Sequence, residues 1–373
     1  MNGPVPLDEY PIHQIPRSLA YVGPSDRNFY DRWYFNAHDR TGEVFLVTGM
    51  GVYPNLGVTD AFATIRRGTT QCTVRMSDAL GDDRLHPRVG PYRIEVIEPL
   101  QRIRLLCEAE EHGLGFDLTW EGSFPAVEEQ PHLMRQGRRP ILDACRFAQV
   151  GSWSGWVKAG STEYDVTPDT WIGTRDRSWG IRPVGEPEPA GRPDQGGEGF
   201  WWLYVPLRFE DFAVVVIVQE QPDGFRTLND ATRVWPDGTV EQLGWPRVEI
   251  GYRSGTRHPE NAVLHLSEKG GSPATIEIDT LGLVALNVGT GYGGDPEWGH
   301  GRWMGESWCE GSAYDLDEPA IAGRIPFGVV DHVARAWWRD SSGETREGWG
   351  MFEHASIGRH DPTGFADWSS VAI

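Results

Sequence analysis

The chain has 373 residues, and its 54 acidic and 34 basic side chains give it a formal net charge of -20. Nucleic acids and anionic membranes bind basic faces, so this composition excludes both as partners. No apolar run reaches the roughly 18 residues of a membrane-spanning helix, and the first residues lack the basic and apolar regions of a signal peptide. We therefore expect a cytoplasmic protein without a membrane span, while the sequence leaves its oligomeric state open.

Cofactor and metal motifs are weak in this sequence. The four cysteines lie far apart and form no C-x-x-C pair, which argues against a zinc ribbon or a dense disulfide framework. The histidine pairs His258 with His265 and His354 with His360 lack the spacing of metal sites. Residues 289–294 match G-x-G-x-x-G, but the sequence after them does not favour the helix that a dinucleotide site needs. The sequence therefore predicts neither a cofactor nor a metal.

Residues 1–25 are rich in proline and predict an irregular arm. Residues 28–39 contain many aromatic side chains, which favour strands, and a turn at residues 41–42 separates them from a strand over residues 43–48. Apolar and polar residues then alternate with a period of two, as in strands with one buried face. This pattern predicts strands over residues 61–65, 72–76, 92–97, 102–108 and 115–120.

The second part of the chain continues in the same way. Residues 128–140 are polar and predict a connection or a short helix. Glycine and proline dominate residues 185–199, which predict a flexible surface loop, with a lid over a pocket as the alternative. Pro-Asp-Gly turns at residues 222–224 and 236–238 mark hairpins. Further strands are predicted over residues 146–156, 171–182, 200–206, 212–219, 247–250, 262–266, 274–278, 283–288, 334–338 and 349–354.

Strands at short spacing, with turn signals between them and no sustained helical period, predict an all-β protein. The chain contains 17 tryptophans, nearly all of them after residue 150. These side chains offer large apolar surfaces, either for a β core or for the wall of a wide cavity.

One strand, over residues 171–182, combines charges, tryptophans and glycines in the order Trp-Ile-Gly-Thr-Arg-Asp-Arg-Ser-Trp-Gly-Ile-Arg. Alternation places Asp176 on one face and Arg175 and Arg177 on the other. The glycines near its two ends indicate a bulge or a close approach of neighbouring backbones. Two interpretations stay open: a structural ion-pair strand, or a strand that holds Asp176 in an apolar pocket as a general acid.

Two segments carry a resemblance to a known family. The first is Arg32-Trp33-Tyr34-Phe35, followed by Asp39 and Gly42, and the second is Gly173-Thr-Arg-Asp176-Arg-Ser-Trp179-Gly180. In these segments the chain resembles the carotenoid 1,2-hydratase/AttH-like superfamily. The resemblance implies two lipocalin-like antiparallel β-barrel or sandwich domains in tandem, at residues 1–160 and 161–373, with Asp176 at the site. Members of the superfamily include hydratases of isolated alkenes, cyclases of the Diels–Alder type and proteins of unknown function.

Protonation of an isolated alkene needs a carboxyl group that stays neutral at pH 7, which burial in an apolar wall provides. It also needs aromatic faces that stabilise the carbocation. We therefore expect a cofactor-free hydratase, isomerase or cyclase that acts on a terpenoid, steroid or polyketide-like lipophile, with Asp176 as the acid. The expected substrate-binding residues are Trp33, Tyr34, Trp179, Trp201, Trp202, His300 and His354, and each histidine has a structural role as its alternative.

Two other classes of function stay open. A non-catalytic lipocalin-like carrier of a hydrophobic small molecule would keep the cavity but would not need Asp176 for its activity. A structural or interaction protein would show no sizeable cavity.

Overall fold

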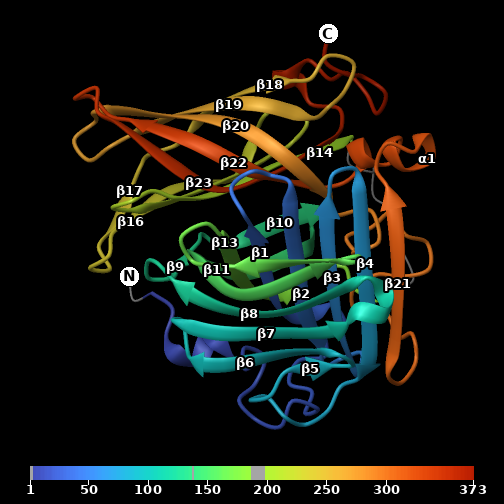
Figure 1. Ribbon diagram of the computed structural model, residues 1–373. Helices are drawn as coiled ribbons and strands as arrows, with labels where there is room; N and C mark the ends of the chain where they lie inside the picture. The colour runs from blue at the N-terminus through green and yellow to red at the C-terminus, as the bar shows by residue number, and fades with distance from the viewer. Residues whose placement is uncertain (1–2, 137, 186–197) are drawn as a thin grey trace.

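The computed structural model describes residues 3–136, 138–185 and 198–373. Within these ranges the chain consists almost entirely of antiparallel strands, which form two curled, half-barrel sheets (Figure 1). This architecture confirms the predicted all-β fold class. No helix in the described ranges combines the length and the apolarity that crossing a bilayer requires.

The first sheet contains most of the N-terminal half of the chain. Its described strands are β1 (Phe29–His38), β2 (Val44–Tyr53), β3 (Val58–Arg67), β4 (Thr70–Ala79), β5 (Arg88–Val89), β6 (Tyr92–Glu98), β7 (Arg102–Ala109), β8 (Leu114–Gly122), β9 (Val127–Glu128), β10 (His132–Gln136), β11 (Arg139–Ala159), β12 (Thr162–Val166), β13 (Ile172–Ile181) and β21 (Trp308–Asp315). They run in the order β21-β4-β3-β2-β1-β13-β11-β8-β7-β6-β5, and β9, β10 and β12 also pair with β11.

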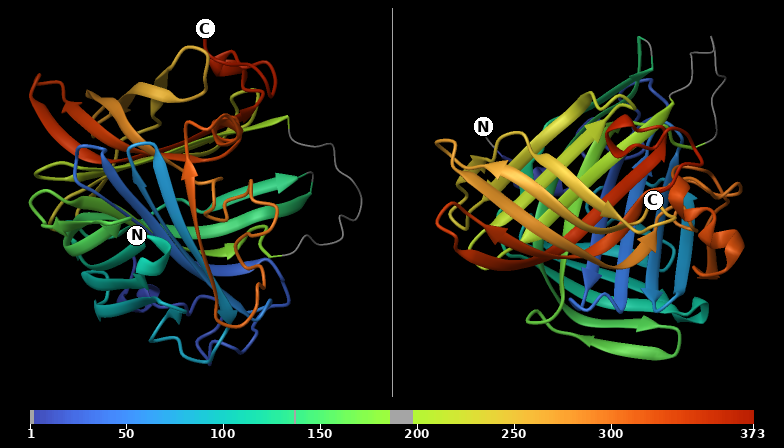
Figure 2. Two further views of the ribbon diagram at one scale, coloured as in Figure 1. Left: turned by 45° about the vertical axis from the view of Figure 1, so that its right-hand side comes forward. Right: turned by 90° about the horizontal axis from the view of Figure 1, so that it is seen from above.

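The second sheet lies above the first in Figure 1, and Figure 2 shows its strands crossing over those of the first sheet. Its described strands are β14 (Gly199–Arg208), β15 (Ala213–Glu220), β16 (Arg226–Val234), β17 (Val240–Gln242), β18 (Arg247–Tyr252), β19 (Pro259–Ser267), β20 (Pro273–Ala285), β22 (Val330–Arg339) and β23 (Thr345–Gly358). Their order is β17-β16-β15-β14-β23-β22-β20-β19-β18. The short helical segments are η1 (Pro6–Glu9), η2 (Glu110–His112), α1 (Pro319–Ala322), η3 (Ile325–Phe327) and η4 (Asp361–Thr363).

Where the two sheets meet, strands are buried on both faces. All ten residues of β1 are buried, and alternation sends Trp33 into a core enclosed by the first sheet while Tyr34 packs between the sheets. In β14, Trp201 packs in the core of the second sheet and Trp202 packs between the sheets. The described residues therefore form three large apolar layers, beside two smaller clusters, and the middle layer receives side chains from both sheets.

Several segments of the structure differ from the pattern that the sequence predicts. Residues 132–136 form β10, which pairs with the start of β11, so the connection or short helix expected over residues 128–140 is wrong. The strands β12 and β21 were not predicted. Most of the loop expected over residues 185–199 lies outside the described residues.

The division into domains after residue 160 stays a prediction, because the sheets exchange segments. The strands β12 and β13 follow that position and still pair with β11 of the first sheet. The strand β21 returns from the second half of the chain and pairs with β4, where Figure 1 shows it in orange beside blue strands. The two sheets are therefore tied together by the chain as well as by the middle apolar layer.

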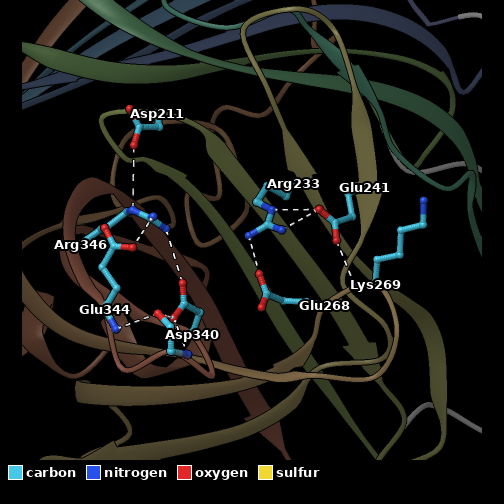
Figure 3. A network of polar contacts seen from close by, with 9 residues as sticks. Asp211, Arg233, Glu241, Glu268, Lys269, Asp340, Glu344 and Arg346 are labelled. Atoms are coloured by element: carbon cyan, nitrogen blue, oxygen red, sulfur yellow. Dashed lines mark hydrogen bonds and ion pairs between the residues drawn. The ribbon is translucent and has the colours of Figure 1, made fainter.

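An ion-pair network fastens one end of the second sheet (Figure 3). Arg233 of β16 lies 2.6 Å from Glu241 of β17 and 2.8 Å from Glu268, and its guanidinium covers the ring of Trp338. Arg346 reaches three further carboxylates nearby. These contacts join strand ends and loops, so we assign them an architectural role.

Candidate active site between the sheets

A cavity of about 170 Å³ lies in the middle layer, between the two sheets. One wall comes from β1, β10, β11 and β13, and the other comes from β14, β15, β23 and the segment between β20 and β22. A cavity of about 150 Å³ in another protein holds benzene, so this one has room for a group of about that size. The charged and aromatic side chains among its lining residues are Tyr30, Tyr34, His132, Arg146, Asp176, Arg182, Phe200, Trp202, Tyr292 and Glu353.

Asp176 enters this cavity from β13, where it lies opposite Tyr34 of β1 and Ala148 of β11 in the sheet register. The residue is 8% exposed, and its carboxyl group has no hydrogen-bond partner within the described ranges. Burial raises the pKa of Asp176 from 3.8 to about 7, with the charge of Arg146 opposing that rise. A carboxyl group in this environment exchanges its proton near neutral pH.

The two arginines beside Asp176 in the sequence point away from it, as alternation predicts. Arg175 forms an ion pair of 2.8 Å with Glu9 of the N-terminal arm, and Arg177 forms one of 2.7 Å with Asp31 of β1. All four of these side chains are buried. One face of β13 therefore carries structural ion pairs, and the other face presents a carboxyl group to a cavity.

A second carboxyl group, which the sequence did not single out, reaches the cavity from the opposite sheet. Glu353 of β23 accepts a hydrogen bond of 2.5 Å from the Trp202 indole. Directly across the strand pair lies Asp331 of β22, whose carboxyl accepts a hydrogen bond of 2.5 Å from the Tyr34 hydroxyl. Burial raises the pKa of Asp331 well above its usual range and also raises that of Glu353.

Two arginines bring positive charge to the cavity. Arg146 lies 2.6 Å from Glu129 and covers the ring of Tyr204 at 4.1 Å. Arg182 covers the ring of Tyr30 at 4.8 Å and donates a hydrogen bond of 2.6 Å to His300 Nδ1. Arg182 has no ion-pair partner within the described ranges, so its charge is available at the edge of the cavity.

A groove of about 660 Å³ adjoins the cavity and shares Leu142, Arg182 and Tyr292 with it. His300 lines this groove. Burial and two neighbouring arginines hold the pKa of His300 well below its usual range, so the imidazole is neutral. Its Nδ1 accepts from Arg182, and its Nε2 donates to the Thr290 carbonyl at 2.9 Å.

The residues predicted for the site separate according to strand alternation. Asp176, Tyr34 and Trp202 line the cavity, and His300 lines the adjoining groove. The other predicted residues lie outside both spaces: Trp33 and Trp201 fill the cores of the two sheets, Trp179 stacks on His13, and His354 hydrogen-bonds to Tyr252 on the far face of β23. In β1 the core residue Trp33 precedes the cavity residue Tyr34, and in β14 the core residue Trp201 precedes Trp202. Adjacent residues of a strand point to opposite faces.

The sequence does contain a feature that points to Glu353 and Asp331 as residues of the site. Each is an acidic residue within a largely apolar strand, and in β23 the position of Glu353 follows the same face as Met351 and Ala355, which pack between the sheets. No group of three or more metal-ligating side chains with the arrangement of a metal site occurs among residues 3–136, 138–185 and 198–373.

A model of a family of unknown function, DUF8625, matches residues 5–366. The chain belongs to that family. No curated protein matches the sequence.

Two solved structures share the fold of this DUF8625 member. Kievitone hydratase from Nectria haematococca is 13% identical, with a TM-score of 0.51 over 91% of this chain and 90% of its own. A candidate AttH from Nitrosomonas europaea is 14% identical, with a TM-score of 0.52 over 87% of this chain and 92% of its own. The predicted resemblance to AttH-like proteins is thereby confirmed at the level of the fold.

Proposed function

We propose that the protein is a cofactor-free hydratase, isomerase or cyclase that uses Asp176 to protonate an isolated double bond of a lipophilic substrate of terpenoid, steroid or polyketide type. The observation that carries this proposal is the Asp176 carboxyl, which borders the cavity without a hydrogen-bond partner in the described chain and has a pKa of about 7. At neutral pH a large fraction of this group therefore holds the proton that the reaction requires.

The surroundings of Asp176 suit a developing carbocation. Transfer of the carboxyl proton to one alkene carbon leaves positive charge on the other, and aromatic faces stabilise such a charge. The rings of Tyr30, Tyr34, Tyr292 and Trp202 line the cavity. Its volume of about 170 Å³ suits the reacting end of a substrate, and the adjoining groove of about 660 Å³ has room for the rest. Water or a second double bond then captures the cation.

The fold supports the same proposal. A protein named as a hydratase covers nearly the whole chain in the structural comparison, although its identity of 13% relates the folds and not the reactions.

Limonene is a suitable first probe because it is a compact terpenoid whose protonation gives a tertiary cation, and geraniol tests a linear terpenoid. Capture of the limonene cation by water gives α-terpineol, which chromatography and mass spectrometry detect.

The decisive experiment compares the wild-type protein with Asp176→Asn on these two terpenoids. We expect a loss of conversion of about 10²–10⁴-fold, which is the usual contribution of a general acid, with binding of limonene unchanged. Asp165→Asn is the control, because Asp165 is an exposed carboxyl on β12 of the same sheet. Full activity of Asp176→Asn would refute the role of this carboxyl.

The carrier remains the second candidate, because the same cavity and groove suit a ligand that is held without reaction. A carrier would bind limonene or geraniol and return both unchanged, and Asp176→Asn would bind them equally well. That pair of results would overturn the enzyme proposal.

A further inference from the structure

Two acidic side chains lie opposite each other inside the molecule. Asp331 and Glu353 are directly paired residues of the antiparallel strands β22 and β23. Side chains at such positions are about 5 Å apart at Cβ, and two like charges there destabilise a sheet. Asp331 has an exposed fraction of 0%, so water does not screen the repulsion. The pair is therefore expected to hold one proton at neutral pH.

The hydrogen bonds indicate which carboxyl group holds that proton. Asp331 Oδ2 accepts from the Tyr34 hydroxyl, whereas Asp331 Oδ1 is buried and receives no donor from the described residues. When Oδ1 carries the proton, it can donate a hydrogen bond to the Glu353 carboxylate. Glu353 in turn accepts from the Trp202 indole and borders the cavity, whereas Asp331 does not border it.

We propose that Glu353 is a second catalytic residue, the carboxylate that removes a proton from the water that captures the carbocation, and that Asp331 keeps it ionised by holding the proton of the pair. This inference rests on the proposed function. It adds that the reaction is a hydration, with the acid on one sheet and the base on the other. Asp331 acts through Glu353 and is a positioning residue.

The step balances in atoms and charge. The O–H bond of Asp176 breaks, and its proton forms a C–H bond with the electron pair of the alkene. The oxygen of water forms a C–O bond with the cationic carbon, and one proton of that water passes to Glu353. The product is the alcohol, with Asp176 ionised and Glu353 neutral. Glu353 then releases its proton and Asp176 takes one up, which restores both groups.

The charged groups around Glu353 come from several elements. Arg146 of β11 favours the ionised form of Glu353, as does the hydrogen bond from Trp202, whereas Glu129, which precedes β10, opposes it. Asp176 of β13 shares the cavity and adds little repulsion while it is neutral. The site therefore places a proton donor and a proton acceptor at one small space without pairing them with each other.

Infrared spectroscopy tests the position of the proton without any substrate, because protonated carboxyl groups absorb apart from carboxylates. Asp331→Asn should remove a band that persists above neutral pH, Asp176→Asn should remove one that disappears near pH 7, and Glu353→Gln should remove none at neutral pH. Loss of a neutral-pH carboxyl band in Glu353→Gln, or no band that responds to Asp331→Asn, would overturn the proposal.

Limonene in deuterated water tests the role of Glu353 in the reaction. Glu353→Gln keeps an oxygen that accepts from Trp202, and it should reduce α-terpineol formation at least about 100-fold. It should still return deuterated limonene or its double-bond isomers, because Asp176 continues to protonate the alkene. Formation of α-terpineol within threefold of wild type, or loss of deuterium exchange together with hydration in a folded protein, would refute the inference.

These outcomes separate the two proposals. Asp176→Asn should abolish both deuterium exchange and hydration, so the proposed function fails if that variant keeps both, whatever Glu353 does. The positioning role of Asp331 has its own readout. Asp331→Ala should move the acidic limb of the pH–rate profile to higher pH, because Glu353 loses a hydrogen bond that favours its charge, and Asp331→Asn should restore the limb. An unchanged limb in Asp331→Ala would remove Asp331 from the proposal.

Discussion

The pKa of Asp176 predicts an unusual dependence of stability on pH. The folded protein holds this carboxyl neutral up to a pKa of about 7, whereas an ordinary aspartate has a pKa of 3.8. Between these values the folded state binds more protons than the unfolded state, so its stability falls as pH rises. The contribution from Asp176 is fully present below about pH 4 and is lost as the pH rises through about 7.

The substitution Asp176→Asn removes this loss, because the amide is neutral at every pH and has nearly the same shape. The rise from 3.8 to about 7 corresponds to about 4 kcal/mol of free energy of unfolding. That figure is an upper bound, because water in the cavity lowers the cost of the charge. We therefore expect Asp176→Asn to match wild type near pH 4 and to exceed it by up to about 4 kcal/mol above pH 7.

Urea unfolding at a series of pH values between about 4 and 8.5 measures this difference. Asp165→Asn serves as the control, since the exposed carboxyl on β12 should give a small difference at every pH. A structural aspartate would behave in the opposite way, because its loss destabilises a protein. If Asp176→Asn is less stable than wild type at pH 8, or if the difference between them stays constant with pH, the reasoning about this cavity is wrong.

Two further predictions concern the other face of β13 and its packing. Glu9→Gln leaves the fully buried Arg175 without its carboxylate, and should lower the free energy of unfolding by about 3–5 kcal/mol in urea titrations. The exposed pair member Glu347 provides the control, with a loss below about 1 kcal/mol for Glu347→Gln; equal losses would contradict the prediction. Gly173→Ala would place a Cβ 1.9 Å from a carbonyl oxygen of β1, and we expect a thermal unfolding experiment to show a loss of at least about 2 kcal/mol. Gly81→Ala meets nothing within 4 Å, and a similar small effect at both glycines would refute the close approach.

Much of the fold follows from local pattern. Period-two alternation located nearly every long strand, because one face of each strand is buried against a core. The pattern also placed Arg175 and Arg177 opposite Asp176, as the ion pairs with Glu9 and Asp31 show. The glycine at position 173 marks a close approach to β1 rather than a bulge, since the register between the two strands continues past it.

The site was only partly predictable, because the middle layer makes both faces of its strands apolar. Local sequence does not say whether Trp201 or Trp202 faces the other sheet, and the structure places only Trp202 at the cavity. The pairing of Asp331 with Glu353 depends on the register of β22 and β23, which is a tertiary property. The return of β21 to the first sheet is equally non-local.

The arrangement of the two carboxyl groups links the proposed chemistry to the packing of one sheet on the other. Asp176 comes from the first sheet and Glu353 from the second, and both border the cavity between the sheets. Burial raises the pKa of both groups, and a raised pKa destabilises the fold wherever the group is ionised. On the opposite face of β13, buried arginines and carboxylates pair at 2.7–2.8 Å. One strand thus combines a face of buried ion pairs with a face that borders the cavity, so a variant that loosens the contact between the sheets should lower the raised pKa of Asp176 before it unfolds the protein.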